Sequence, residues 1–130
     1  MKLALDTNAY SSLQLGNAPI LKAVVDKADL LIIPFVVDAE LRAGFKKGQQ
    51  EKDNYDKLHK FQTLDRVLIL WADEDTNELY ARIWSELARQ GKPIPTNDIW
   101  IAAICLQHQL TLATSDKHLA AVPLLNLISF

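Results

Sequence analysis

Short apolar runs recur along the chain, and longer segments with helical spacing of their apolar residues separate them. Each run has a polar residue or a proline on at least one side, as expected for a buried strand. Four such runs are KLAL (residues 2–5), LLII (30–33), VLIL (67–70) and TLAT (111–114), and LLNLIS near the C terminus predicts a fifth strand.

The segments between these strands predict helices. A helical segment begins near Thr7, and its apolar stripe after Pro19 comprises Ile20, Leu21, Val24 and Val25. Other helices are expected over residues 36–47, in the polar stretch after Gly48, from about residue 75 to Gly91, and over residues 97–108. Asp75 and Glu78 have the spacing of a capping box at the start of the helix that ends at Gly91.

The alternation of short apolar strands with helices indicates a parallel sheet covered on both faces. No internal repeat, low-complexity tract or domain boundary interrupts the pattern, and 130 residues suit one domain. We therefore expect an α/β fold, with a single domain over residues 1–130 and a five-stranded parallel sheet flanked by helices.

Composition describes an ordinary globular protein, with 49% apolar and 23% charged residues. The net charge of −2 provides no overall basic field for nucleic acid, so any such contact needs a local basic patch. No apolar run is long enough to span a membrane and the N terminus lacks a secretory signal, so we expect a cytoplasmic protein. The single cysteine, Cys105, lies in an apolar helix and is expected to be a buried thiol.

Two aspartates follow predicted strands. Asp6 comes directly after the first strand, and one residue separates Asp116 from the end of the fourth. Because ligands of an open parallel sheet bind at the carboxyl ends of its strands, both aspartates are expected on one rim. Either aspartate also suits a helix N-cap, which needs no ligand.

Two further acids lie on predicted helices. The residues three and four positions from Glu40 are small or apolar, and Arg42, two positions away, lies on a different face of the helix. Asp98 lies in a first helical turn, where the helix dipole favours negative charge, yet Thr96 and Asn97 already offer caps. Both acids are therefore candidates for a functional role.

Convergence of these four carboxylates predicts a site for a divalent cation. Like charges in one pocket repel each other and raise at least one pKa, and a cation relieves that repulsion. Oxygen ligands suit Mg²⁺ or Mn²⁺ rather than zinc or copper, and the chemistry natural to such a site is hydrolysis of a phosphodiester. Thr7, Asn8 and Ser115 add polar groups suited to orienting carboxylates or water.

Four motifs in order, LALDTN, VVDAELRAG, PTNDIWIAA and LATSDKHL, resemble those of the PIN-domain ribonucleases. The likeness is greatest to the VapC-type toxins of toxin–antitoxin pairs, and it spans nearly the whole chain. Each motif is weak alone, but the ordered set is more specific. An aromatic residue often stands in the family where this chain has Leu119, and the last acid is the least constant of the four.

The resemblance implies a five-stranded parallel sheet and a Mg²⁺- or Mn²⁺-dependent endoribonuclease. Because proteins usually read unpaired bases in RNA, we expect the substrate to be single-stranded or loop RNA. It also implies a small antitoxin as partner and a homodimer. The residues carried over by motif are the metal-binding catalytic acids Asp6, Glu40, Asp98 and Asp116 and the supporting residues Thr7, Asn8 and Ser115.

Other interpretations stay open. The chain is alternatively a PIN nuclease without an antitoxin, or a non-catalytic binding module whose acids only cap helices. A haloacid-dehalogenase-type phosphatase fits poorly, because Asn8 stands where that family needs a second aspartate. A response-regulator receiver also fits poorly, because Asp73 comes three residues after the third strand.

Several basic and aromatic residues are candidates for contact with RNA, against the simpler interpretation that they form a solvated face or part of the core. Trp84, in the middle of a predicted helix, is expected in the core or in an interface. The candidates for RNA contact are Arg42, Lys46, Lys47, His118, Trp71 and Trp100.

Overall fold

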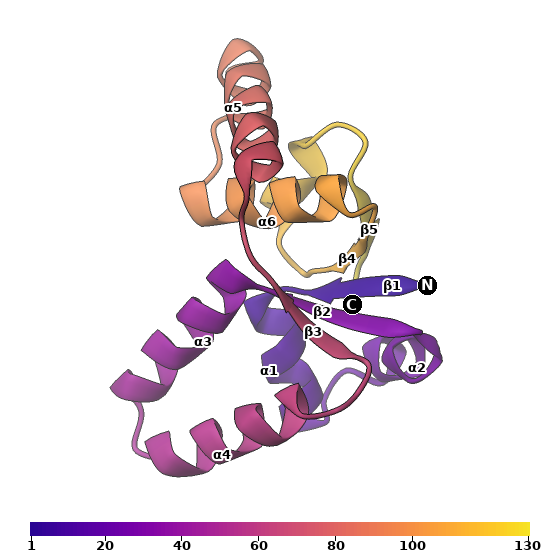
Figure 1. The fold of residues 1–130 in the computed structure, drawn as a ribbon, viewed down its shortest axis with the longest axis vertical. Helices are drawn as coiled ribbons and strands as arrows, with labels where there is room; N and C mark the ends of the chain where they lie inside the picture. Colours follow the sequence, from indigo (N-terminus) through magenta and orange to yellow (C-terminus); the bar gives the residue numbers. More distant parts are fainter.

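The computed structural model describes all residues from 1 to 130 and has a five-stranded parallel sheet at its centre (Figure 1). The strands are β1 (Lys2–Leu5), β2 (Leu30–Pro34), β3 (Val67–Leu70), β4 (Thr111–Ala113) and β5 (Asn126–Ile128). They lie in the order β3-β2-β1-β4-β5, and every neighbouring pair is parallel. The chain therefore adds strands first on one side of β1 and then on the other, so the order reverses between β1 and β4.

The register of β1 and β4 brings their carboxyl ends to the same level. Leu5, the last residue of β1, lies opposite Ala113, the last residue of β4. The backbone N–H of Asp6 donates to the Ala113 carbonyl at 3.3 Å. Asp6 and Thr114 thus leave the sheet side by side, at the switch point where ligands bind in open α/β sheets.

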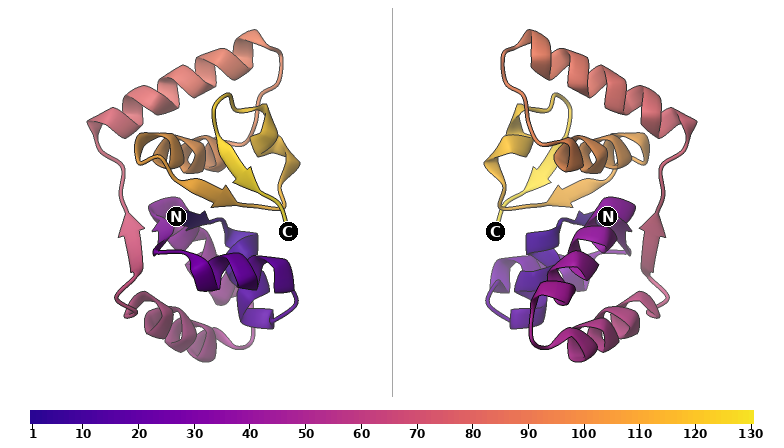
Figure 2. Two further views of the ribbon diagram at one scale, coloured as in Figure 1. Left: turned by 90° about the vertical axis from the view of Figure 1, so that its right-hand side faces the viewer. Right: turned by 90° about the vertical axis from the view of Figure 1, so that its left-hand side faces the viewer.

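Six α-helices and a short 3₁₀ helix surround the sheet (Figures 1 and 2). Each connection between parallel strands contains at least one of them, as a parallel crossover requires. They are α1 (Thr7–Leu15), α2 (Pro19–Lys27), α3 (Phe35–Lys47), α4 (Glu51–Gln62), α5 (Glu74–Arg89), α6 (Thr96–Gln107) and η1 (Lys117–Ala121).

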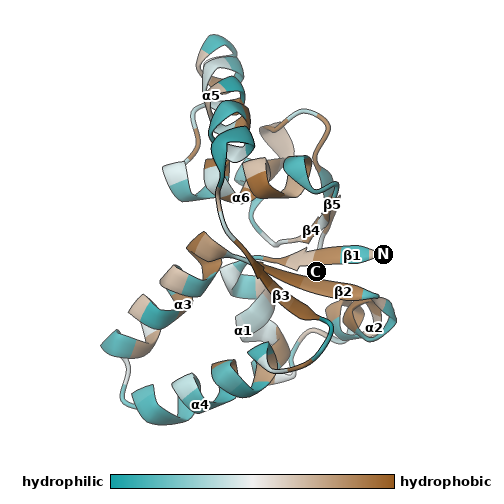
Figure 3. Cartoon of the chain, viewed as in Figure 1, coloured by the Kyte–Doolittle hydropathy of each residue, from teal (hydrophilic) through white to brown (hydrophobic).

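Side chains of β1 alternate between two apolar clusters, as the pleat of a strand requires. Leu3 and Leu5 pack in a cluster with Leu21 and Val25 of α2. Ala4 belongs to the larger cluster, which contains the buried residues of α3 and α6 and the inner residues of α5. Figure 3 shows the strands as hydrophobic and α4 and α5 as largely hydrophilic, so the core lies against the sheet and along α6.

These features confirm the predicted α/β fold and its parallel sheet. Every predicted strand is present, and the bounds of β1 and β3 are those expected from the apolar runs. No helix of the structure is both long enough and apolar enough to cross a bilayer.

The helical segment expected from about Thr7 forms two helices, α1 and α2. Gly16 ends α1 with φ of +69°, a left-handed conformation that glycine adopts without the steric strain of a Cβ, and its N–H donates to the carbonyls of Ser12 and Leu13. Of the expected stripe, Leu21 and Val25 are buried, whereas Ile20 is exposed.

The prediction that Asp75 and Glu78 form the capping box of α5 is wrong, because Asp73 and Thr76 form it. The Thr76 N–H donates to Oδ1 of Asp73, and the Asp73 N–H donates to the Thr76 hydroxyl. Threonine thus takes the place of the usual glutamate at this position. Trp84, which we expected in the core or in an interface, lies outside the core, because 57% of its surface is exposed.

Candidate active site

All four candidate acids converge near the carboxyl ends of β1 and β4. Asp6 directly follows β1 and Asp116 directly precedes η1, whereas Glu40 lies on α3 and Asp98 in the first turn of α6. The carboxylate of Asp6 is close enough to those of Asp116 and Glu40 for their charges to raise its pKa. The same two charges raise the pKa of Asp98. Four segments far apart in the sequence therefore share one acidic site.

Asp6 is the most buried of the four acids, with 6% of its surface exposed. It is also the N-cap of α1, because its Oδ1 accepts the Ala9 N–H at 2.7 Å. Burial raises its pKa, and the charges of Asp116 and Glu40 add to the shift, while the Thr114 hydroxyl and the Ala9 N–H oppose it. The side chain of Asp6 thus both caps α1 and belongs to the acidic site.

Asp98 has the largest shift among the acids, with a pKa raised to about 6. The causes are, in order, burial, the charge of Asp116, a hydrogen bond with Asp116 and the charge of Glu40, and His118 opposes them. The side chain is 16% exposed and caps nothing. Near neutral pH, the protein therefore holds this carboxylate in an environment that disfavours its charge.

The premise that Thr96 and Asn97 offer alternative caps for α6 is wrong. The helix begins at Thr96, so both residues lie inside its first turn, and Pro95 occupies the N-cap position without a side-chain hydrogen bond. No side-chain cap therefore competes with Asp98 for the N–H groups at this end of α6, where the helix dipole favours negative charge.

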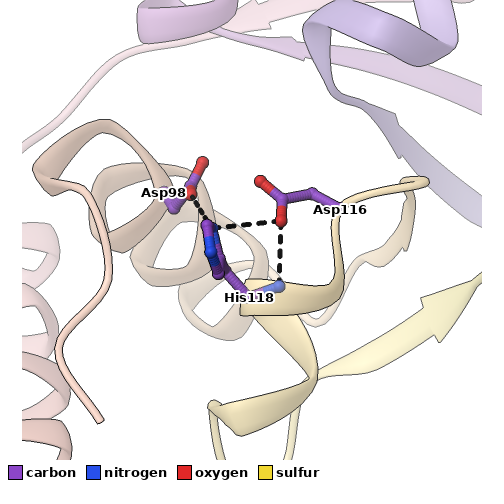
Figure 4. Close-up of side chains that lie close together, drawn as sticks. All are labelled: Asp98, Asp116 and His118. Carbon is purple, nitrogen blue, oxygen red and sulfur yellow. Dashed lines mark hydrogen bonds and ion pairs between the residues drawn. The ribbon is translucent and has the colours of Figure 1, made fainter.

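Asp116 is held by hydrogen bonds on both sides. Its backbone N–H donates to the Thr114 hydroxyl at 2.9 Å, and its Oδ1 accepts the His118 N–H at 2.9 Å as the N-cap of η1. The His118 imidazole also turns toward the acids, with Nδ1 3.2 Å from Oδ1 of Asp116 and 3.9 Å from Oδ2 of Asp98 (Figure 4).

Glu40 is partly exposed and points toward the first turn of α1. The Thr7 hydroxyl donates to its Oε1 at 3.1 Å. Val36 and Val37, one turn before Glu40, are buried, whereas Ala43 and Gly44, one turn after it, are exposed. Glu40 therefore lies where α3 leaves the core. For this reason its side chain is less buried than its apolar neighbours in the sequence indicate.

The other two expected supporting residues form no hydrogen bond with the acids. Asn8 and Ser115 are both exposed. Thr114, which immediately precedes Ser115, instead contacts Asp116 and Asp6 and is buried. In the sequence, Thr114 looks like any threonine at the end of an apolar strand, so nothing there indicated that its hydroxyl contacts the acids.

Asp38 is a buried acid that sequence reasoning missed. Its carboxylate accepts Nε of Arg42 at 2.9 Å and Nε2 of Gln62 at 2.7 Å, and so ties α3 to α4. The spacing of Asp38 and Arg42 is the i,i+4 spacing of a helical ion pair, which was the available signal.

Of the three basic candidates on α3, two are already paired with acids. Arg42 binds Asp38, and Nζ of Lys46 lies 2.6 Å from Glu51, whereas Lys47 forms no ion pair. They do not form an unpaired basic patch that would attract RNA phosphates.

Two tryptophans flank Phe35, the first residue of α3. Trp71 is exposed and stacks on Phe35 with ring centroids 6.1 Å apart, and Trp100 meets Phe35 edge-on at 5.8 Å. Phe35 follows β2 and Trp71 follows β3, so aromatic rings continue the same rim of the sheet beyond Asp6.

The donors present fit a hard divalent cation. They are four carboxylates of which two have raised pKa values, and neither lysine nor arginine pairs with any of them, while the His118 imidazole lies beside two. Carboxylate oxygen is the ligand that Mg²⁺ and Mn²⁺ take in proteins, and their charge would offset the repulsion that raises these pKa values.

Comparison with known families and proteins agrees with this geometry. The model of the PIN domain matches residues 3–125. The ribonuclease VapC1 of Haemophilus influenzae strain R2866 is 31% identical, over 86% of this chain and 84% of its own length. The ribonuclease VapC5 of Mycobacterium tuberculosis is 25% identical, over 91% of this chain and 85% of its own.

Two solved structures share the fold over nearly the whole chain. VapBC2 of Rickettsia felis, bound to a DNA fragment from its promoter, superposes with a TM-score of 0.88 at 25% identity, covering 100% of this chain and 99% of the matched chain. VapBC-1 of nontypeable Haemophilus influenzae has a TM-score of 0.88 at 27% identity, covering 99% and 98%.

Proposed function

We propose that this chain, which belongs to the PIN-domain family, is a Mg²⁺- or Mn²⁺-dependent endoribonuclease and the toxin of a toxin–antitoxin pair. The observation that carries the proposal is the carboxylate of Asp98, whose pKa of about 6 reflects burial beside Asp116 and Glu40. If the acids served only as helix caps, Asp98, which caps no helix, would not be expected among them.

In this proposal Asp6, Glu40, Asp98 and Asp116 hold the cation and form the catalytic site, and residues 1–130 make up one nuclease domain. When bound, the cation supplies positive charge that offsets the carboxylates and the charge that develops on the phosphodiester during hydrolysis. The substrate is RNA whose bases are unpaired, because proteins read such bases more readily than those of a duplex.

Each acid is positioned by a different local device. Hydrogen bonds from the backbone fix Asp6 and Asp116 at the starts of α1 and η1. The Thr7 hydroxyl fixes one oxygen of Glu40. Asp98 caps no helix, and its carboxylate contacts only other members of the site, since it shares a hydrogen bond with Asp116.

The proposed partners follow from the relatives. The curated VapC relatives are ribonucleases, and the two VapBC structures pair a chain of this fold with its partner. We therefore propose a small antitoxin that binds this chain, a homodimer of the chain itself and a cytoplasmic location. Asn8 and Ser115 are proposed to act on substrate or water, because both are exposed and form no hydrogen bond with the acids.

Cleavage of a dye-labelled single-stranded RNA by the purified chain tests the activity. We expect cleavage with Mg²⁺ or Mn²⁺, none with EDTA, and slower cleavage of the same sequence in a duplex. Equal rates with and without EDTA would contradict the metal requirement.

A thermal-shift titration separates the nuclease from the rival binding module. A nuclease site binds the cation only in the folded state, so Mn²⁺ should raise Tm in a concentration-dependent way. A module whose acids only cap helices predicts no shift in Tm.

A further inference from the structure

His118 is placed to do more than contact substrate. Its imidazole and the carboxylates of Asp98 and Asp116 each bring one donor atom to a group in which all three atoms lie within 4.8 Å of one another. The three residues come from η1, the first turn of α6 and the segment after β4, and their side chains face a common point (Figure 4). This arrangement mixes nitrogen with oxygen donors.

The spacing of these donors suits a single ion. An ion bound at about 2.1–2.2 Å holds two ligands at right angles about 3 Å apart and two opposite ligands about 4.3 Å apart. The distances from Nδ1 of His118, 3.2 Å to Asp116 and 3.9 Å to Asp98, lie within or close to that range. Only small side-chain movements would therefore bring all three atoms into one coordination sphere.

The backbone also fixes the position of His118, although its side chain is 61% exposed. Its N–H donates to Oδ1 of Asp116, and the next residue, Leu119, is buried in the core. The imidazole is therefore carried by a turn that is anchored on both sides, so little backbone entropy is lost when it binds an ion.

We propose that His118 donates an imidazole nitrogen to the divalent cation held by Asp98 and Asp116, and that this ligand gives the centre a preference for Mn²⁺ over Mg²⁺. This inference rests on the proposed metal-dependent nuclease. Mg²⁺ takes oxygen ligands almost entirely, whereas imidazole binds the transition metals. A centre of four carboxylates alone carries no such preference for nitrogen-binding metals.

Pulsed electron paramagnetic resonance of bound Mn²⁺ reports a directly coordinated nitrogen through its hyperfine coupling. The comparison uses the full-length protein, H118Q, and H59Q as the matched control, since His59 lies on α4 and is exposed. We expect the nitrogen coupling in the wild type and in H59Q, and its loss in H118Q. The Kd for Mn²⁺ should rise about tenfold in H118Q, whereas the Kd for Mg²⁺ should change less than about threefold.

Two results would overturn the inference, and only the second would also overturn the proposed nuclease. Mn²⁺ bound to the wild type without nitrogen coupling, and with an unchanged Kd in H118Q, would show that His118 only pairs with the acids, and the proposed nuclease would stand. Failure of the wild type to bind Mn²⁺ at all would overturn the proposed metal-dependent nuclease as well.

Discussion

The hydroxyl of Thr7 donates a hydrogen bond to Oε1 of Glu40 at 3.1 Å and so joins the first turn of α1 to the middle of α3. Thr7 directly follows Asp6, so one short segment both supplies an acid and orients another. Groups that orient a ligating carboxylate contribute to metal affinity and activity without touching the metal themselves.

Replacing Thr7 with valine should lower RNA cleavage by about 10- to 100-fold, the usual effect of losing such an orienting group. Valine keeps the shape of threonine and removes only the donor. The measurement is the single-turnover rate at saturating Mn²⁺. Serine at this position keeps the hydroxyl and should retain most of the activity, so equal losses in T7V and T7S would contradict the role assigned to this hydrogen bond.

Asp98 should make the metal-free protein less stable as pH rises. Its pKa is about 6 in the folded state and 3.8 in the reference state, so folding favours the protonated form. The associated stability is fully present below pH 3.8 and is lost as pH rises through about 6. Asparagine carries no charge and avoids this loss. Because the two pKa values differ by about 2, D98N should be more stable than the wild type at pH 7.5 by up to about 3 kcal/mol.

Urea unfolding in EDTA at pH 7.5 and pH 4.5 measures this difference. The advantage of D98N should shrink by more than half at pH 4.5, because the wild-type carboxylate is then protonated in the native state. An advantage that is the same at both pH values would show that it does not arise from ionisation of Asp98.

Asp38 should matter for stability, because it is buried and accepts hydrogen bonds from both Arg42 and Gln62. Its replacement by alanine leaves these two donors without their partner, and should lower the free energy of unfolding by about 2–3 kcal/mol. The matched control is D26A, which removes an exposed i,i+4 pair with Lys22 and should change stability by less than about 1 kcal/mol. Similar losses in D38A and D26A would contradict the structural role of Asp38.

Tyr10 carries a buried hydroxyl for which the structure gives no hydrogen-bond partner. Burial raises the pKa of this phenol to about 12. Since an unpaired buried polar group is unfavourable, Y10F should leave stability unchanged or raise it by about 1 kcal/mol. The edge-to-face contact with Phe61 is kept by phenylalanine. Chemical denaturation checks this, and a loss of more than about 1 kcal/mol would mean that the hydroxyl has a partner in solution.

Most of the fold was predictable because the strands are apolar on both faces. A run such as LLII, between Asp29 and Pro34, has few other places to lie than a sheet covered by helices, and in β2 it is almost wholly buried. Asp6 and Asp116 were predictable for a related reason, since the carboxyl ends of neighbouring parallel strands meet at one rim. These inferences rest on residues close together in the sequence.

Features that depend on long-range contacts were not predictable in the same way. The capping box of α5 uses Asp73 and Thr76 in place of Asp75 and Glu78, and Thr76 also bonds to Gln107 of α6, a partner that local spacing cannot indicate. Likewise, His118 meets Asp98 only because η1 folds over the start of α6.

The central claim is that Asp98 belongs to a metal-dependent catalytic site. The most direct test is the single-turnover rate of RNA cleavage at saturating Mn²⁺ by D98N, beside D26N, whose changed carboxylate lies on the exposed face of α2. We predict that D98N, folded and at least as stable as the wild type, cleaves at least about 100-fold more slowly, whereas D26N keeps the wild-type rate. Cleavage by D98N at the wild-type rate would contradict the claim.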